Sequence, residues 1–189
     1  MLQVITIDRS ETETNNKLWK DLLINAYNYT YKNNDFSKEI TDNNLETFWN
    51  YLQTDTVQIV LRQNKFIGFF FNKINSINKE ITFFLFIYSQ ACPMSSRSLM
   101  KCAVIRSLLI SFKNKKDINK LEFFTWHPSL IHVARNIIPI TTHMITSDYI
   151  VCYLPFDNLL EDLTKNKLKL YLGVEDYHTI DIDNFKVFY

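Results

Sequence analysis

A short polar turn and the helix that follows it carry the residues with the clearest chemical potential. The turn reads SQACPMSS over 89–96, and the segment after it has apolar residues at helical spacing. Ser95 and Ser96 are suited to cap this helix, because a short hydroxyl accepts a hydrogen bond from an unpaired backbone N–H. Arg97 and Lys101 add cations that the helix dipole alone disfavours and that a bound anion would favour. The pattern predicts a phosphate-like anion site, or simply two cations on a solvated helix face.

Two side chains near this turn are candidates for proton transfer. His127 directly follows an apolar strand, so it is either a general base at the rim of the sheet or a residue that caps the next helix beside Trp126. Tyr88 ends another apolar strand and either donates a proton or packs as an aromatic side chain. Cys92 lies near a helix start, which lowers a thiol pKa, so a Cys–His nucleophile with His127 or His132 is a further alternative. No spacing of Cys or His predicts a metal site.

Length and composition favour one domain with a large core. The chain has 189 residues, of which 47% are hydrophobic and 15% aromatic, and its net charge is +1. So small a charge produces no field that would recruit nucleic acid. The three cysteines have no CxxC spacing, and no segment has the length and pattern of a signal peptide or a membrane span. We therefore expect a cytoplasmic protein without membrane or nucleic-acid partners.

The spacing of apolar residues predicts groups of strands that alternate with helices. Strand 80–88 (EITFFLFIY) is apolar on both faces and should lie centrally in its sheet. Gly68, inside the preceding strand, predicts a bulge or a close backbone approach. The polar segment 8–15 is expected to be a connection. The predicted elements up to residue 154 are strand 2–7, a helix at about 15–32, a shorter helix with Leu45, Phe48, Trp49 and Leu52 on one face, strands 56–62, 66–74 and 80–88, helix 97–113, strand 121–126, a helix from Pro128 to Pro139, and strands 140–146 and 149–154.

Residues 155–189 differ in character from the rest and are expected to form an extension packed on a domain of residues 1–154. Pro155 marks the change, since it follows the last strand of the predicted domain. The predicted elements of the extension are a short helix carrying Leu159, Leu160 and Leu163, a strand at 167–172 (KLKLYL) that Gly173 ends, and a terminal strand or small hairpin within 178–189.

This order of elements resembles the GCN5-related N-acetyltransferase (GNAT) fold over most of residues 1–154. The resemblance implies an α+β fold with a mixed, mainly antiparallel central sheet flanked by about four helices, here followed by the C-terminal extension. It also implies that the fourth and fifth strands diverge, so that the pantetheine arm of acetyl-CoA enters between them and the next turn binds its pyrophosphate. The positions implied as cofactor contacts are Ile87, Tyr88, Gln90, Ser95, Ser96, Arg97, Ser98 and Lys101.

Two functions follow from this resemblance. The first is an acyl-CoA-dependent N-acyltransferase that acetylates an amine of a small molecule or a protein, with His127 and Tyr88 as catalytic residues. The second is a catalytically inactive protein of the same fold that binds or inhibits a protein partner through the apolar cleft or the added C-terminal strand. The segment 90–98 lacks the glycines of the family's Gln/Arg-x-x-Gly-x-Gly/Ala motif, which favours the second, whereas its serines and Arg97 favour the first. The sequence specifies neither acceptor nor partner, and a homodimer is compatible with both.

Overall fold

The computed structural model describes residues 1–14, 17–32, 44–88, 94–113, 118, 120–125, 128–137, 142–145, 150–153 and 158–188. Its strands are β1 (Leu2–Asp8), β2 (Thr56–Arg62), β3 (Lys65–Asn75), β4 (Glu80–Ile87), β5 (Lys120–Thr125), β6 (Thr142–Ile145), β7 (Ile150–Tyr153) and β8 (Asn184–Val187). Its helices are α1 (Arg9–Thr14), α2 (Lys17–Lys32), α3 (Leu45–Leu52), α4 (Met94–Lys113), α5 (Pro128–Ile137) and α6 (Asn158–Leu172), with a short 3-10 helix η1 (Tyr177–Thr179).

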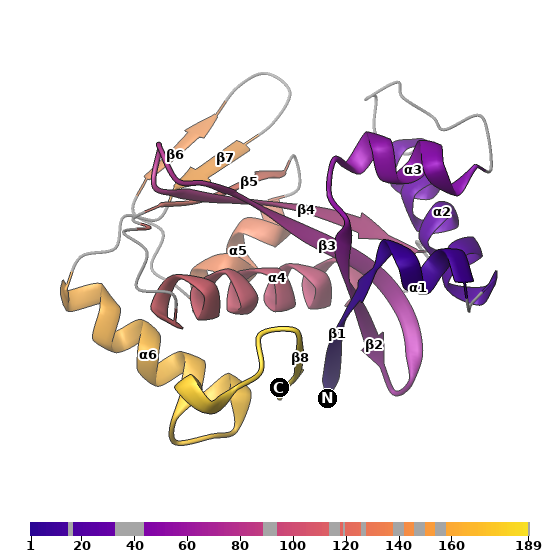
Figure 1. The fold of residues 1–189 in the computed structure, drawn as a ribbon. Helices are drawn as coiled ribbons and strands as arrows, with labels where there is room; N and C mark the ends of the chain where they lie inside the picture. Colours follow the sequence, from indigo (N-terminus) through magenta and orange to yellow (C-terminus); the bar gives the residue numbers. More distant parts are fainter. Residues whose placement is uncertain are drawn as a thin grey trace.

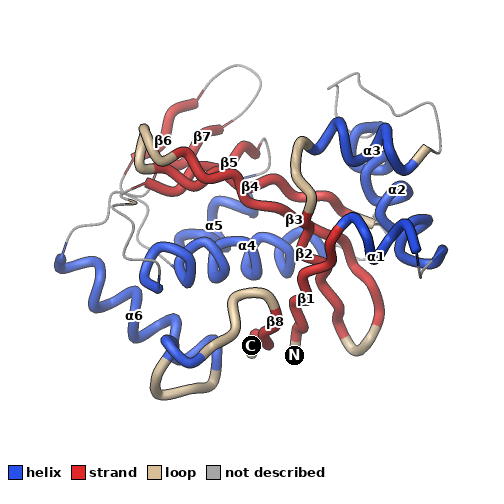
Figure 2. Tube along the Cα trace, viewed as in Figure 1, coloured by secondary structure: helices blue, strands red, loops and turns tan. Residues whose placement is uncertain are grey.

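The strands within the described ranges form one eight-stranded sheet in the order β6-β7-β5-β4-β3-β2-β1-β8. The strands β8, β1, β2, β3 and β4 pair antiparallel in that order. β4 and β5 then pair in parallel, and β5, β7 and β6 are antiparallel again. The sheet is therefore mixed and mainly antiparallel, which confirms the predicted fold class. β4 lies inside the sheet, as its two apolar faces predicted (Figure 2).

Helices cover both faces of the sheet and divide the core into two clusters (Figure 1). α4 and α5 lie on one face, and α2 and α3 lie on the other, where Phe48 and Trp49 of α3 are buried. The alternation along β4 explains this division, because Ile81 and Phe83 belong to the α4 cluster and Phe86 to the α2–α3 cluster. No described helix combines enough length with enough apolar character to pass through a bilayer.

The segment 8–15, expected to be a connection, instead contains α1. Asp8 caps this helix, because its carboxylate accepts a hydrogen bond from the backbone N–H of Glu11 at 3.0 Å, while the Glu11 carboxylate accepts one from the N–H of Asp8 at 2.9 Å. This reciprocal arrangement is a capping box, which stabilises even a short helix without an apolar face. The hydrogen bond from the Ser10 hydroxyl and the one from the Glu11 amide lower the pKa of Asp8.

Residues 167–172, expected to form a strand, are the second half of α6. Leu168 and Leu172, four positions apart, are buried, whereas Leu170 between them is 75% exposed. Burial at a spacing of four is the pattern of a helix face, and a strand would have turned all three leucines the same way. Gly173 ends this helix, where the sequence had placed the end of a strand: its φ of +66° turns the chain so that the N–H of Val174 donates to the carbonyl of Lys169 at 3.3 Å.

The chain ends beside its beginning. β8 pairs antiparallel with β1, from Leu2 opposite Val187 to Ile5 opposite Asn184, which confirms the predicted terminal strand. The two termini consequently lie together at one edge of the sheet (Figure 1). The predicted domain boundary at residue 154 stays a prediction, because 154–157 lie outside the described residues.

Gly68 allows a close approach between β3, β4 and α4. The register of β2 and β3 shifts between Val60 and Leu61, opposite this glycine, which confirms the predicted bulge. Gly68 has a φ of +149°, and a Cβ at this position would lie 2.3 Å from the carbonyl oxygen of Phe86 and 2.7 Å from a methyl group of Leu99. Only a residue without a side chain fits between β4 and the start of α4 here.

Candidate functional site

β4 and β5 are paired along only half of their length. The parallel register runs from Glu80 opposite Lys120 to Phe83 opposite Phe123. Beyond these pairs, β5 continues along β7 to Thr125 and β4 continues along β3 to its end, without a further pair between them in the described parts of the two strands. The two strands therefore diverge after Phe83 and Phe123, as the resemblance implied.

The free edge of β4 presents backbone groups toward this divergence. The N–H of Tyr88 donates to the carbonyl of Ile67 on β3 at 3.1 Å, so the groups of the preceding residue, Ile87, point toward β5. Thr30 of α2 occupies them: the Ile87 N–H donates to the Thr30 hydroxyl oxygen at 2.7 Å, and that hydroxyl donates to the Ile87 carbonyl at 3.3 Å. Leu85, two residues earlier, has the same orientation on the strand.

The start of α4 lies at the open end of the divergence. Because the helix begins at Met94, Ser95 and Ser96 lie in its first turn, and the prediction that one of them caps the helix is wrong. Ser95 and Ser98 are buried, Ser96 is half-buried, and Arg97 is exposed. Of the predicted anion contacts that the structure describes, Arg97 is thus exposed, and Ser96 and Lys101 are half-buried. The predicted contact Gln90 lies outside the described residues.

Lys101 and Tyr88 have identifiable contacts of their own. The Lys101 ammonium lies 4.9 Å from the ring centroid of Tyr171 on α6, a cation–π distance, and burial lowers the pKa of this lysine. Tyr88 is half-buried and packs edge-on against Phe66 at 5.3 Å between ring centroids. The predicted base His127 and the nucleophile candidate Cys92 lie outside the described residues, so their roles stay predictions.

A pair of carboxyl groups, absent from the sequence-based candidates, lies at the closed end of the divergence. The Thr82 hydroxyl is 3.3 Å from a carboxylate oxygen of Glu80 and 3.2 Å from one of Glu122. The Lys120 ammonium forms a salt bridge with Glu80 at 3.2 Å, and the Glu80 side chain is 8% exposed. Glu122 precedes Phe123, the last residue of β5 that pairs with β4, so the carboxyl pair is adjacent to the point where the two strands separate.

The environment pushes the pKa values of the two carboxyl groups apart. Burial raises the pKa of Glu122 to about 7, and its hydrogen bond to Glu80 and the repulsion between the two groups act in the same direction. The pKa of Glu80 is lowered, mainly because it accepts a hydrogen bond from Glu122 and also because of Lys120. Two carboxyl groups whose pKa values are pushed apart can exchange a proton with a bound molecule.

Only part of this arrangement of the two carboxyl groups could be predicted from the sequence. Residues 80 and 82 point to one face of β4, and 120 and 122 point to one face of β5, which the alternation of each strand predicts. Their meeting depends on the parallel register of two strands whose paired residues are forty positions apart. The connection between β4 and β5 is long, so the sequence does not determine how the two strands align. Glu122 could therefore not be placed beside Glu80 in advance.

Comparison of the sequence with known protein families gave no match, and comparison with curated proteins gave none either. Solved structures do resemble this fold. A spermidine N-acetyltransferase from Vibrio cholerae, in complex with CoA and spermine, matches with a TM-score of 0.51 and 15% identity over 85% of this chain and 97% of that one. A putative acetyltransferase from Salmonella typhimurium, yncA, with its cofactor acetyl-CoA, matches with a TM-score of 0.51 and 11% identity over 83% and 95%.

These likenesses and the diverging strands define the class of the protein by its architecture. The chain has the GNAT fold, which confirms the resemblance inferred from the order of its elements. At 11% and 15% identity the likeness extends to the fold and not to the chemistry of individual side chains.

Proposed function

We propose that this protein is an acyl-CoA-dependent N-acyltransferase that transfers an acetyl group from acetyl-CoA to an amine. The observation that carries the proposal is the divergence of β4 and β5 after Phe83 and Phe123, with two carboxyl groups bridged by the Thr82 hydroxyl at its closed end and a helix start at its open end. Acyl transfer needs these three features together, since the acyl donor must be held, the attacking amine must lose a proton, and developing charge must be stabilised.

The chain's own groups suit a CoA thioester. The edge of β4 offers the backbone N–H and C=O groups of Leu85, and it would also offer those of Ile87 once Thr30 releases them. Such groups pair with the amides of a pantetheine arm. The first backbone N–H groups of α4, with Ser96 and Arg97 beside them, suit a pyrophosphate. When bound, acetyl-CoA would supply the activated acyl group as a thioester.

The carboxyl pair gives this site its general base. An amine reaches the site mainly as an ammonium ion, and it must become neutral before it can attack a carbonyl carbon. Glu80, whose pKa is lowered, attracts the cation, and Glu122, whose pKa is about 7, accepts its proton at neutral pH. Tyr88 remains the proposed donor of a proton to the departing sulfur, with His127 as an additional base.

Acetyl-CoA binding and thiol release test this proposal. Acetyl-CoA at about 100 times its Kd should stabilise the protein by about 2.7 kcal/mol, which is visible as a thermal shift. Arg97→Glu should abolish the shift, while Glu122→Gln should keep the shift and slow the release of free CoA with an amine such as spermidine. The absence of any shift at millimolar acetyl-CoA would contradict the enzyme reading.

A catalytically inactive binding protein is the second candidate. The two hydrogen bonds between Thr30 and the backbone of Ile87 favour it, because they occupy the strand edge that an acyl-CoA would need. In that case acetyl-CoA gives no thermal shift, and no amine releases CoA from it.

A further inference from the structure

The row of residues that contains Glu122 continues across the sheet to a lysine. In the register of the three strands, Lys73 on β3 lies opposite Thr82 on β4, and Thr82 lies opposite Glu122 on β5. Neighbouring strands are about 4.8 Å apart, so the backbone positions of Lys73 and Glu122 are separated by roughly 10 Å. The row therefore carries a cation at one end, a hydroxyl in the middle and the proposed general base at the other end.

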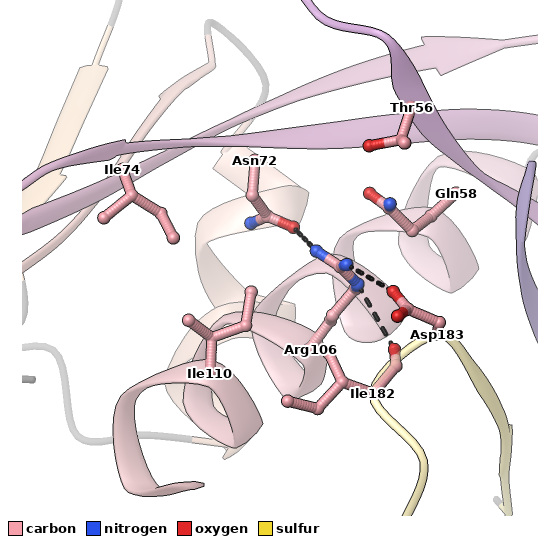
Figure 3. A pocket seen from close by; sticks show the side chains of 8 residues that line it. All are labelled: Thr56, Gln58, Asn72, Ile74, Arg106, Ile110, Ile182 and Asp183. Atoms are coloured by element: carbon pink, nitrogen blue, oxygen red, sulfur yellow. Dashed lines mark hydrogen bonds and ion pairs between the residues drawn. The ribbon is translucent and has the colours of Figure 1, made fainter. Parts of the chain in front are cut away.

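Lys73 lies on the face of the sheet that α2 and α3 partly cover. Its neighbours along β3, Asn72 and Ile74, point to the opposite face, where Asn72 accepts a hydrogen bond from Arg106 on α4 at 2.8 Å (Figure 3). Because side chains alternate along a strand, Lys73 points away from α4.

Thr82 and Glu122 lie on the same face as Lys73. The residues on either side of them belong to the buried α4 cluster: Ile81, Phe83, Leu121 and Phe123. Lys73, Thr82 and Glu122 are half-buried, so each keeps part of its surface accessible to solvent. The three side chains can therefore contact one molecule that lies across β3, β4 and β5.

The Lys73 ammonium lies over two aromatic rings. Its Nζ is 5.8 Å from the ring centroid of Phe71 and 5.6 Å from that of Phe84, and it donates to the Gln53 side-chain oxygen at 3.3 Å. No carboxylate in the described ranges forms an ion pair with it. Since an ammonium has three N–H groups, Lys73 can donate to a further acceptor.

These contacts favour an anion at the Lys73 end of the row and oppose a second cation there. The rings of Phe71 and Phe84 stack at 5.0 Å between centroids, and Lys73 already supplies the cation that such rings attract. A ligand ammonium beside Lys73 would be repelled by a like charge, whereas a ligand anion would form an ion pair with it. At the other end of the row, Glu122 receives the amine that is to be acylated.

We propose that the acceptor is an amine whose far end carries an anionic group, with Lys73 as the contact for that group. This inference rests on the function proposed above and specifies its substrate class. The acceptor ammonium gives one proton to Glu122. Its nitrogen then bonds to the acetyl carbon while the bond from that carbon to sulfur breaks, and a second proton passes from nitrogen to sulfur, so CoA leaves as a thiol. The acceptor must span most of the roughly 10 Å between the two ends of the row, which suits an ω-amino acid.

Three acceptors that differ only at the far end test this specificity. The compounds ε-aminocaproate, hexylamine and hexamethylenediamine carry the same primary amine on chains of similar length and end in a carboxylate, a methyl group and a second ammonium. With acetyl-CoA, we expect kcat/KM for CoA release to be about tenfold higher for ε-aminocaproate than for hexylamine, and lower still for the diamine. Without acetyl-CoA, nuclear magnetic resonance should show shifts of the Lys73 and Thr82 backbone amide signals that saturate at a lower concentration of ε-aminocaproate than of the diamine.

Variants of Lys73 assign the preference to this residue. Lys73→Met should bring the kcat/KM ratio of ε-aminocaproate to hexylamine close to one, Lys73→Glu should favour the diamine, and Lys73→Arg should keep the preference for the carboxylate. Lys65→Met removes a lysine at the other end of β3 and should leave the ratio as it is in the wild type.

The outcomes separate this inference from the function on which it rests. If CoA is released but the three acceptors react equally, or if Lys73→Met keeps the preference, the acceptor class is wrong and acyl transfer stands. If no amine releases CoA and acetyl-CoA gives no thermal shift, both proposals are overturned.

Discussion

At the scale of single residues, Thr30 occupies backbone groups at the edge of β4 that faces away from β3. Its hydroxyl both accepts from and donates to the backbone of Ile87, so a helix side chain satisfies groups that a neighbouring strand would otherwise satisfy. Without Thr30, a partly buried N–H and C=O would lack a protein partner. Bound pantetheine would offer the same kind of partner, so in the proposed enzyme Thr30 and the cofactor compete for one position.

Thr30→Val should therefore change stability and cofactor affinity in opposite directions. Valine has the shape of threonine without the hydroxyl, so the free energy of unfolding should fall by about 1–3 kcal/mol, while acetyl-CoA binding becomes tighter. Chemical denaturation and calorimetric titration measure the two effects. Thr54→Val is the matched control, because its hydroxyl also bonds to a backbone carbonyl but in an exposed position. A variant that loses both stability and affinity would rule out the competition.

Glu122→Gln should remove a pH dependence of stability. The folded-state pKa of Glu122 is raised to about 7, so this group contributes stability that is fully present below its unfolded pKa and is lost as the pH rises through about 7. A glutamine amide can donate to Glu80 as the protonated carboxyl does, at every pH. We expect similar stability of variant and wild type at about pH 4 and a more stable variant at about pH 8.5, as measured by urea denaturation. Equal pH profiles would mean that Glu122 titrates normally.

At the scale of elements, the leucines of α6 distinguish a helix from a strand at 167–172. Leu168→Ala should lower the free energy of unfolding by about 2–5 kcal/mol, because this side chain is fully buried beside α4 and α5. Leu170→Ala should change it by less than about 0.5 kcal/mol, because Leu170 is 75% exposed. Denaturant titration of both variants is sufficient. Similar losses of unfolding free energy in the two variants would instead indicate the strand that the alternation of KLKLYL predicted.

The elements that were predicted well share a strong local signal. Apolar alternation and polar turns marked β1 to β4, and a glycine inside β3 marked the bulge. α1 was missed because RSETET has no apolar face, although Asp8 and Glu11 have the spacing of a capping box. KLKLYL fits both a period of two and a spacing of four, so only packing against the rest of the core decides between them. The divergence of β4 and β5 followed from fold resemblance, whereas the Glu80–Glu122 pair depended on their register.

At the scale of the whole molecule, the C-terminal extension joins the first strand, α4 and the sheet edge. β8 extends the sheet beyond β1, and the segment before it pairs Asp183 with Arg106 and Thr6. These contacts lie at the opposite end of α4 from the proposed cofactor site. The two ends of this helix can therefore be perturbed independently, provided that the helix itself stays folded.

Asp183→Asn and Asp183→Ala test this independence. The amide oxygen of asparagine can still accept from Arg106 and Thr6, so Asp183→Asn should cost less than about 1 kcal/mol, in line with a carboxylate that is half exposed. Asp183→Ala leaves the guanidinium of Arg106, which is 11% exposed, without this partner and should cost about 1–3 kcal/mol. Both variants should keep the thermal shift produced by acetyl-CoA in the wild type, because Arg97 and the β4 edge are unchanged. Equal losses for the two variants would mean that the charge of Asp183 matters more than its hydrogen bonds, and a lost acetyl-CoA response would mean that the extension and the cofactor site are coupled through α4.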